Sequence, residues 1–298
     1  MPRHAGVFVN PVAGGGKWRK AYPTVVRRLL EAGIVCDVRV SQYAGQITEF
    51  ASELAAQGHE TFVACGGDGT VNEVINAIAG TGAALGIVPM GTANDFAVNM
   101  GISRHIDVAC EIIRQRRVRK IDLVNVDHDK FFAATACLGF DAEVAAFATK
   151  RRKKRSNPFV LHVLGGILKF FSYKPRTVEL RFNGQKYSGD IFLVAFGNIQ
   201  SYARGMLITP GAVFDDALVD ICIIGGMPKR KVLSIFPSVY KGTHVNYREV
   251  TLYRARTVYV QSLGPMDLYA DGDFMATTPF RLEVVPKHLN VIVGPSCS

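Results

Sequence analysis

Three glycine-rich segments have the residue types needed to bind phosphate in this chain of 298 residues. The first reads NPVAGGGK from Asn10, the second reads GGDGTVNE from Gly66, and the third reads GTANDF from Gly91. Glycine lets the backbone come close to a phosphate, and the N-terminus of a following helix supplies unpaired N–H groups. One such segment alone is often only a turn between a strand and a helix. Three of them favour a nucleotide-binding site.

Charged and polar side chains in these segments suggest what the bound phosphate would meet. Asp68 would repel a bare phosphate, so it suits a site where it meets a phosphate-bound metal ion or accepts a proton. Asp68 and Asp95 have the alternative role of capping the helices that follow them. Thr92 and Asn94 offer neutral polar contacts. Lys17 offers a point charge, although the segment is not a Walker A motif, and a solvated lysine is the alternative.

Two further acidic segments lie in the second half of the chain. Asp271 and Asp273 flank a glycine, which suits either a tight turn or a carboxylate near a transferred phosphoryl group. An aspartate with an ordinary pKa of about 3.9 is ionised at neutral pH and can accept a proton. The adjacent acids Asp215 and Asp216 have the chemistry to ligate a hard cation together with backbone carbonyls.

The segments that must position these residues change character along the chain. Over the first 125 residues, strand and helix patterns alternate, which predicts a parallel sheet with helices on both faces. Strands are expected at residues 6–10, 34–40, 61–65 and 85–88. Ligands bind such sheets at the carboxyl ends of the strands, and the glycine-rich segments follow these ends.

From about residue 120 onward, most segments are strand-like and separated by turns, which predicts an antiparallel β-sandwich. A helix is expected at 142–150, and separate strands are expected at 281–285 and 289–293. The predicted fold class is α/β plus β. A Rossmann-like nucleotide-binding domain would span residues 1–125, which the extreme C-terminus can rejoin, and an antiparallel β-sandwich domain would span residues 126–298.

Charge and cysteine content narrow the classes of partner and compartment. A formal charge of +10 and a pI near 9.4 indicate an anionic partner, such as a nucleotide, a nucleic acid or an acidic membrane. The six cysteines are far apart and form no CxxC or Cys/His cluster, which disfavours structural zinc and a disulfide scaffold. We therefore expect a reducing, cytoplasmic environment. The longest charge-free stretch, 74–94, is broken by glycines and a proline and does not resemble a membrane span.

A basic block at residues 150–155 is followed by an apolar segment at 158–171. Cations near a membrane are attracted to anionic headgroups by roughly 1 kcal/mol each, and apolar side chains can enter the acyl boundary. The alternative is a solvated run followed by a packed helix. Because the block lacks interleaved aromatic residues and no nucleic-acid motif is present, we expect no nucleic-acid binding.

Together with residues 271–273, the loops at 10–14, 66–70 and 91–96 resemble the diacylglycerol kinase catalytic-domain family. The resemblance is strongest to the bacterial soluble lipid kinases, which include YegS-like and sphingosine-kinase-like proteins, and it covers essentially the whole chain. It implies an α/β domain and a β-sandwich with ATP bound in the cleft between them. It also implies ATP- and Mg²⁺-dependent transfer of the γ-phosphate to a lipid hydroxyl, with diacylglycerol as the first candidate acceptor and phosphatidic acid as its product. Other glycerolipids and sphingoid bases stay open as acceptors.

The resemblance also assigns site residues. ATP would contact Asn10, Pro11, Val12, Ala13, Gly14, Ser41, Gly66, Gly67, Asp68, Gly69, Thr70, Val71, Asn72, Glu73 and Thr92. Asp68, Asp95 and Asp273 would form the catalytic group, with Asp273 as proton acceptor. The family usually has Glu at position 273, so Asp271 stays an alternative base.

A structural Mg²⁺ is also implied by the resemblance. It would be held by Asp216 and by the carbonyls of Val213 and Leu218. Ala217 replaces the glycine that usually follows the metal-binding aspartate, and Ser41 stands where the family often has threonine.

Two other functions are compatible with part of this pattern. An NAD-kinase-like enzyme would share the GGDGT segment, but the GTAND loop argues against it. A non-catalytic nucleotide sensor that docks on membranes would explain the absence of Glu at position 273. For the lipid kinase, the expected partner is a lipid substrate at an anionic membrane surface, which makes the protein peripherally membrane-associated, and a homodimer is compatible with this prediction.

Overall fold

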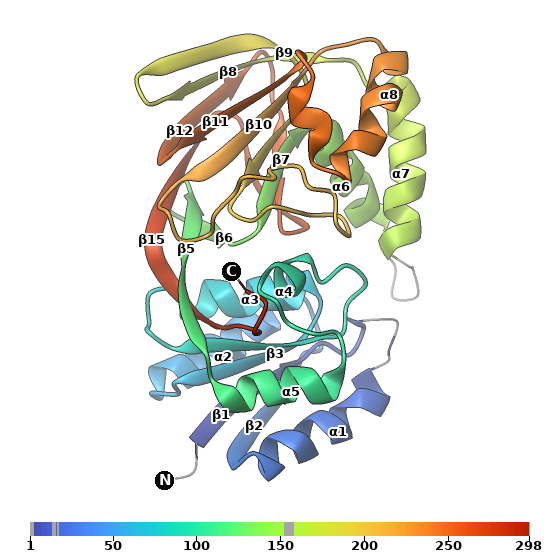
Figure 1. Cartoon of the computed structure of the whole chain (residues 1–298). Coiled ribbons are helices and arrows are strands. Elements are labelled where there is room, and N and C mark those ends of the chain that lie inside the picture. The colour runs from blue at the N-terminus through green and yellow to red at the C-terminus, as the bar shows by residue number, and fades with distance from the viewer. Residues whose placement is uncertain (1–2, 14–15, 17, 152–157, 298) are drawn as a thin grey trace. The chain divides into compact units, whose positions relative to one another are not determined.

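The computed structural model describes residues 3–13, 16, 18–151 and 158–297 (Figure 1). Gly14, Lys17 and most of the basic block lie outside these residues. The chain divides into two compact units, one formed by residues 1–121 and 287–298 and the other by residues 122–286. The division falls within strand β5 (Val118–Val126), as does the expected boundary at residue 125.

The first unit is built on a parallel sheet, as its alternating pattern predicts. Its strands are β1 (Arg3–Val9), β2 (Ile34–Val40), β3 (Thr61–Gly66) and β4 (Ala84–Pro89), in the order β4-β3-β1-β2. The C-terminal part of β15 (Phe280–Ile292) adds a parallel partner to β4. Phe8, Phe62 and Ile87 are fully buried, as expected for central strands covered on both faces.

Helices cover both faces of this sheet. They are α1 (Trp18–Glu31), α2 (Gln46–Ala56), α3 (Asp68–Ile78), α4 (Asp95–Asn99) and α5 (Ile106–Gln115). Figure 1 shows α1 and α5 on one face and α2 and α3 on the other. The α/β prediction for this half of the chain is confirmed.

The second unit is antiparallel, which confirms the other half of the predicted fold. Its strands include β6 (Lys130–Phe132), β7 (Thr135–Gly139), β8 (Arg176–Phe182), β9 (Gln185–Gly197), β10 (Val219–Gly225), β11 (Val250–Ala255), β12 (Thr257–Ser262), β13 (Asp267–Ala270) and β14 (Asp273–Thr277). The order β14-β13-β7-β9-β8-β12 continues into the first part of β15, and β10 pairs with both β9 and β11. Phe132, Phe196 and Phe280 fill the core between the strands.

Among the described residues of this second unit are three α-helices, namely α6 (Phe140–Arg151), α7 (Pro158–Ser172) and α8 (Lys229–Val239). They pack near a second apolar cluster that contains Tyr173 and Phe192. Within the described ranges, none of the helices combines the length and the apolar character needed to cross a bilayer.

Some details differ from the sequence-based expectations, among them one helix and one strand. Helix α8 was not expected, because Pro237 and three leading cations obscure a short helical pattern in a region dominated by strands. The strands expected at 281–285 and 289–293 are one strand, β15. Lys287 within it has a positive φ of 52°, so the polar residues that suggested a turn mark a local irregularity in a continuous strand.

Candidate nucleotide-binding and catalytic site

The predicted phosphate-binding segments begin at one edge of the parallel sheet. The register aligns Val9 with Cys65 and Cys65 with Val88, so β1, β3 and β4 end side by side. Backbone bonds continue this alignment into the loops. The Ser41 N–H donates to the Val9 carbonyl at 3.0 Å, and the Met90 N–H donates to the Gly66 carbonyl at 2.8 Å. The fold thus brings together Ser41 and the loops that were predicted separately.

Close packing within and between two of these loops explains most of their glycines. A Cβ on Gly91 would lie 2.5 Å from the Gly67 Cα, and a Cβ on Gly66 would lie 2.2 Å from the Thr70 Oγ1. By contrast, nothing lies within 4 Å of a Cβ placed on exposed Gly69. Gly67 and Gly91 therefore let the two loops touch each other, and Gly66 makes room for Thr70 of its own loop. Gly69 is the glycine in this group that leaves open space for a ligand.

Asp68 lies at the first residue of α3 and reaches the N-terminus of α4. Its Oδ1 accepts a hydrogen bond from the Phe96 N–H at 3.2 Å. Burial raises the pKa of Asp68 above its ordinary value, although the backbone N–H groups of Phe96 and Asn94 oppose this shift. A carboxylate held between two helix N-termini is favoured by both helix dipoles. Asp68 thus acts as a cap for α4 and also presents a carboxylate at the sheet edge.

The third loop is fixed by Asn94. This buried residue has a positive φ of 54°, its Oδ1 accepts from the Gly91 N–H at 2.8 Å, and its Nδ2 donates to the Gly91 carbonyl at 3.0 Å. The amide that was expected to offer a polar contact to a ligand is therefore used within the loop. Thr92 and Asp95 are partly buried in the same loop.

Other residues of the predicted nucleotide site have definite roles in the fold. The Glu73 carboxylate accepts hydrogen bonds from the Gly45 and Ile47 N–H groups, both at 3.1 Å, and so binds the N-terminal turn of α2. The Asn72 Oδ1 accepts from Asn76 at 2.9 Å. The Thr70 hydroxyl is buried and has no hydrogen-bond partner among the described residues. Thr70 is thus a predicted ATP contact whose hydroxyl forms no hydrogen bond within the described residues.

The first loop turns sharply after β1. The Asn10 Oδ1 accepts from the Val12 N–H at 3.1 Å, and the Asn10 carbonyl accepts from the Ala13 N–H at 3.1 Å. Asparagine is favoured at such turns because its side chain can bind the backbone two residues ahead. Pro11 and Val12 thus follow directly after β1, whose end is aligned with the ends of β3 and β4.

In the second unit, the two aspartates around Gly272 have different environments. The Asp271 carboxylate accepts hydrogen bonds from the backbone N–H groups of Ala133 at 2.9 Å, Ala134 at 3.2 Å and Thr135 at 3.1 Å. It therefore holds the turn between β6 and β7. Asp273 begins β14 and is exposed. The sequence could not separate these two acids, whereas in the structure Asp271 binds three backbone N–H groups and Asp273 is exposed.

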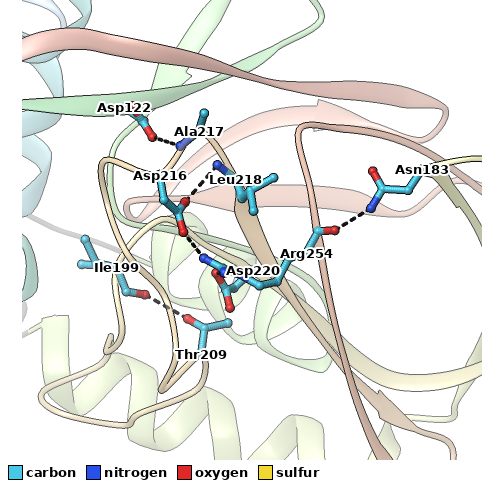
Figure 2. A network of polar contacts seen from close by, with 9 residues as sticks. All are labelled: Asp122, Asn183, Ile199, Thr209, Asp216, Ala217, Leu218, Asp220 and Arg254. Carbon is cyan, nitrogen blue, oxygen red and sulfur yellow. Dashed lines mark hydrogen bonds and ion pairs between the residues drawn. The ribbon is translucent and has the colours of Figure 1, made fainter.

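The loop that was predicted to hold Mg²⁺ is bound by groups of the chain itself (Figure 2). The Asp216 Oδ1 accepts from the Leu218 N–H at 3.0 Å, and its Oδ2 forms an ion pair with the Arg254 guanidinium. Arg254 also pairs with buried Asp220 at 3.2 Å. The described residues contain no group of three or more His, Cys, Asp or Glu side chains placed to hold a metal.

Ala217 in the same loop has a positive φ of 63°, and its N–H donates to the Oδ2 of fully buried Asp122 at 2.6 Å. Sequence reasoning missed both Asp122 and Arg254. As arranged, Asp216 does not accommodate a divalent cation, because Arg254 already supplies the positive charge. The Mg²⁺ site predicted at Val213, Asp216 and Leu218 stays a prediction that requires Arg254 to move away.

Comparison with known proteins agrees with the architecture of both units. The family model described as the diacylglycerol kinase catalytic domain matches residues 4–126. The model described as the YegS C-terminal NAD kinase beta sandwich-like domain matches residues 134–293.

Full-length relatives agree with these matches. A protein of Mycobacterium tuberculosis named "Diacylglycerol kinase" is 32% identical, over 96% of this chain and 93% of its own length. A Yersinia enterocolitica protein named "Probable lipid kinase YegS-like" is 29% identical, over 100% of this chain and 99% of its own length. A solved structure of a diacylglycerol kinase from Bacillus anthracis has a TM-score of 0.76 at 19% identity, covering 100% of this chain and 98% of that one, and so shares its fold.

Proposed function

This chain belongs to the diacylglycerol kinase catalytic-domain family and is a lipid kinase, and from that premise we propose that its acceptor is diacylglycerol, which it converts to phosphatidic acid. The observation that carries the proposal is full-length similarity to proteins named for that reaction, at 32% identity in the M. tuberculosis relative and 26% in one from Staphylococcus carnosus. The YegS-like relatives, whose printed name gives no substrate, keep other lipid hydroxyls as the competing acceptors.

ATP is the proposed phosphoryl donor, bound along the edge of the parallel sheet. The open space at Gly69 supports this, because a phosphate can approach the backbone there at the N-terminus of α3. A phosphate oxygen near Thr70 would also supply the partner that its buried hydroxyl lacks among the described residues. The remaining predicted contacts, including Ser41 and Asn10, start from the same edge.

Mg²⁺ bound with ATP would neutralise the charge of the phosphates, and Asp68 and Asp95 are the residues we assign to hold it. Carboxylate oxygens are the donors that Mg²⁺ prefers, and both aspartates lie at the start of helices beside the phosphate-binding loops. The chain's own contribution is then mainly positioning, with the α3 N-terminus and the loop amides directed at the phosphates.

Asp273 is the proposed proton acceptor for the lipid hydroxyl. Its exposure at the start of β14 leaves it accessible to an acceptor. Asp271 is instead proposed to position this segment, since three backbone N–H groups already use its carboxylate. We also infer that the enzyme acts at the cytoplasmic face of an anionic membrane, which its net charge of +10 supports.

The substrate proposal is tested by measuring transfer of the ATP γ-phosphate to a panel of lipids in mixed micelles with Mg²⁺. The panel contains diacylglycerol, monoacylglycerol, phosphatidylglycerol and a sphingoid base, with NAD as a non-lipid acceptor. We expect labelled phosphatidic acid from the wild type and from Asp129→Asn, a matched change in an exposed turn, and none from Asp68→Asn. Preferred labelling of another lipid would overturn diacylglycerol as the acceptor while leaving the lipid kinase in place.

A further inference from the structure

Helix α7 carries a continuous apolar stripe on the surface of the second unit. Its exposed side chains are Val160, Val163, Leu164, Ile167, Leu168 and Phe171. They recur every three or four residues, which places them on one face of the helix. Phe171 is 72% exposed. Large apolar side chains at this spacing normally face a core, so an exposed stripe indicates a partner.

The opposite face of α7 is already packed, so the stripe is not an unfinished core. A Cβ on Gly165 would lie 2.8 Å from the Phe147 ring of α6, which shows how closely the two helices approach. The Phe170 ring meets the Phe140 ring edge-to-face at 6.2 Å, and Lys169 pairs with Glu143 at 2.9 Å. These contacts fix α7 and leave its apolar stripe on the outside.

Helix α8 presents a second apolar stripe of the same kind. Leu233, Phe236 and Tyr240 are 60%, 49% and 50% exposed, at spacings of three and four residues. Buried Ile235 and Val239 anchor the other face of the helix. Lys229 at the start of α8 donates a hydrogen bond to the Phe171 carbonyl at the end of α7, and Figure 1 shows the two helices as neighbours. We call these two stripes together the α7–α8 surface.

The charged side chains on α7 and α8 are all basic. Neither helix contains Asp or Glu, and exposed cations adjoin them at Lys174, Lys229, Arg230 and Lys241. α8 begins with three basic residues, although cations near a helix N-terminus are disfavoured by the helix dipole. Two of these cations have partners in the fold, since Lys229 donates to the Phe171 carbonyl and Lys231 pairs with Glu249 at 3.5 Å. Helix stability does not explain the position of exposed Arg230, and an anionic partner does.

We propose that the α7–α8 surface docks on an anionic lipid bilayer, with its apolar side chains in the acyl boundary and its cations at the headgroups. This proposal rests on the proposed function only in that the acceptor is a membrane lipid. A second copy of the chain fits less well, because pairing two such surfaces would bring like charges together. Docking would hold the enzyme where a lipid hydroxyl is available, with no helix of the described chain crossing the membrane.

The test measures flotation of the full chain with vesicles of phosphatidylcholine alone or of phosphatidylcholine with phosphatidylglycerol. One variant combines Leu233→Gln with Phe236→Gln, and another combines Ile167→Gln with Phe171→Gln. The matched control is Leu263→Gln, which changes an 83% exposed leucine outside the two helices. We expect the wild type and the control to bind anionic vesicles. Each double variant is expected to bind them at least about tenfold more weakly. A third variant, Arg230→Glu with Lys241→Glu, is expected to lose the preference for anionic vesicles.

Unchanged vesicle binding in the double variants would overturn the proposal, as would equal binding of the wild type to neutral and anionic vesicles. A fall in oligomer mass without a change in vesicle binding would also overturn it and would identify a second copy as the partner. Phosphoryl transfer to a water-dispersed short-chain diacylglycerol is measured beside flotation. If that transfer is absent from the wild type while the variants lose vesicle binding, the docking surface stands and the proposed substrate fails.

Discussion

The aspartate-containing loops of the two units look alike in sequence but differ in how their carboxylates are used. In the first unit, glycines pack the loops against each other, and Asp68 lies between two helix N-termini beside open space at Gly69. In the second unit, three backbone N–H groups bind Asp271, and Arg254 with the Leu218 N–H binds Asp216. An acid in a glycine turn is therefore a sign of chemistry only where the fold leaves it room to meet a ligand.

The change with the largest expected effect removes the Asp68 charge. Asp68→Asn keeps the side-chain shape and an oxygen for the Phe96 N–H, but removes the carboxylate assigned to the phosphate site. We expect kcat for γ-phosphate transfer to fall by about 10²- to 10⁴-fold. Asp129→Asn is the matched control. Near-normal transfer by Asp68→Asn would remove the contrast between the two units, because Asp68 would then be only a helix cap.

Stability gives a second measurement on the same variant. Burial raises the pKa of Asp68, so the folded state holds its proton more tightly than the unfolded state does. The stabilisation that the protonated Asp68 carboxyl contributes is fully present below the ordinary pKa of about 3.9. It is lost as pH rises through the raised pKa of the folded state. Asp68→Asn should therefore gain Tm relative to the wild type across that range. A Tm difference that is constant from pH 3 to pH 7 would contradict the raised pKa.

Asp271 and Asp273 provide the next contrast, now within one turn. Asp271→Asn replaces one acceptor oxygen by an NH₂ group that faces backbone N–H donors, so we expect the free energy of unfolding to fall by about 1–3 kcal/mol. Activity per folded molecule should be mostly kept. Asp273→Asn should change stability little and lower kcat strongly. Urea unfolding and kcat measured on both variants separate the roles, and the opposite pattern would make Asp271 the proton acceptor.

Much of the fold was predictable because it depends on local patterns. The alternation of strands and helices over the first unit and the closely spaced strands of the second identify both architectures. Helix α8 was missed because Pro237 and three leading cations obscure its short pattern. Its exposed Leu233 and Phe236 also add apolar residues opposite the buried face, which weakens the helical periodicity. The continuity of β15 was missed because a strand can pass through an irregularity at Lys287 that resembles a turn in sequence.

For the candidate site, the sequence predicted the positions of the loops but not the partners of their side chains. The glycine-rich loops follow predicted strands, so their shared edge could be inferred. The partners of the acids could not, because they come from distant segments. Asp271 binds amides more than 130 positions earlier in the chain, and Asp216 meets Arg254, which lies 38 positions further on. A lone aspartate in an apolar run, such as Asp122, was the one available signal that a buried acid organises the 213–218 loop.

The predicted Mg²⁺ site competes with the ion pair between Arg254 and Asp216, and stability measurements can separate the two. If Arg254 serves as the cation of this loop, then EDTA and Mg²⁺ should leave the Tm of the nucleotide-free wild type unchanged. Arg254→Gln should lower stability by about 1–2 kcal/mol, discounted for the partial exposure of the pair, because buried Asp220 loses its partner. It should also make the Tm rise with Mg²⁺. A clear Mg²⁺-dependent rise in the wild type would show instead that the ion displaces Arg254.

The smallest expected effect concerns Ala217, whose left-handed conformation favours glycine. Its φ of 63° strains a residue with a Cβ, so Ala217→Gly should relieve that strain while adding freedom to the unfolded chain. We expect a net gain of about 0.5–1 kcal/mol in the free energy of unfolding. Ala212→Gly is the matched control, since Ala212 is buried in the same loop without a positive φ, and it should lose stability. A loss at both positions would mean that the Ala217 methyl group packs favourably enough to outweigh the strain. The 213–218 loop would then be stabilised by the Ala217 methyl group as well as by the ion pair between Asp216 and Arg254.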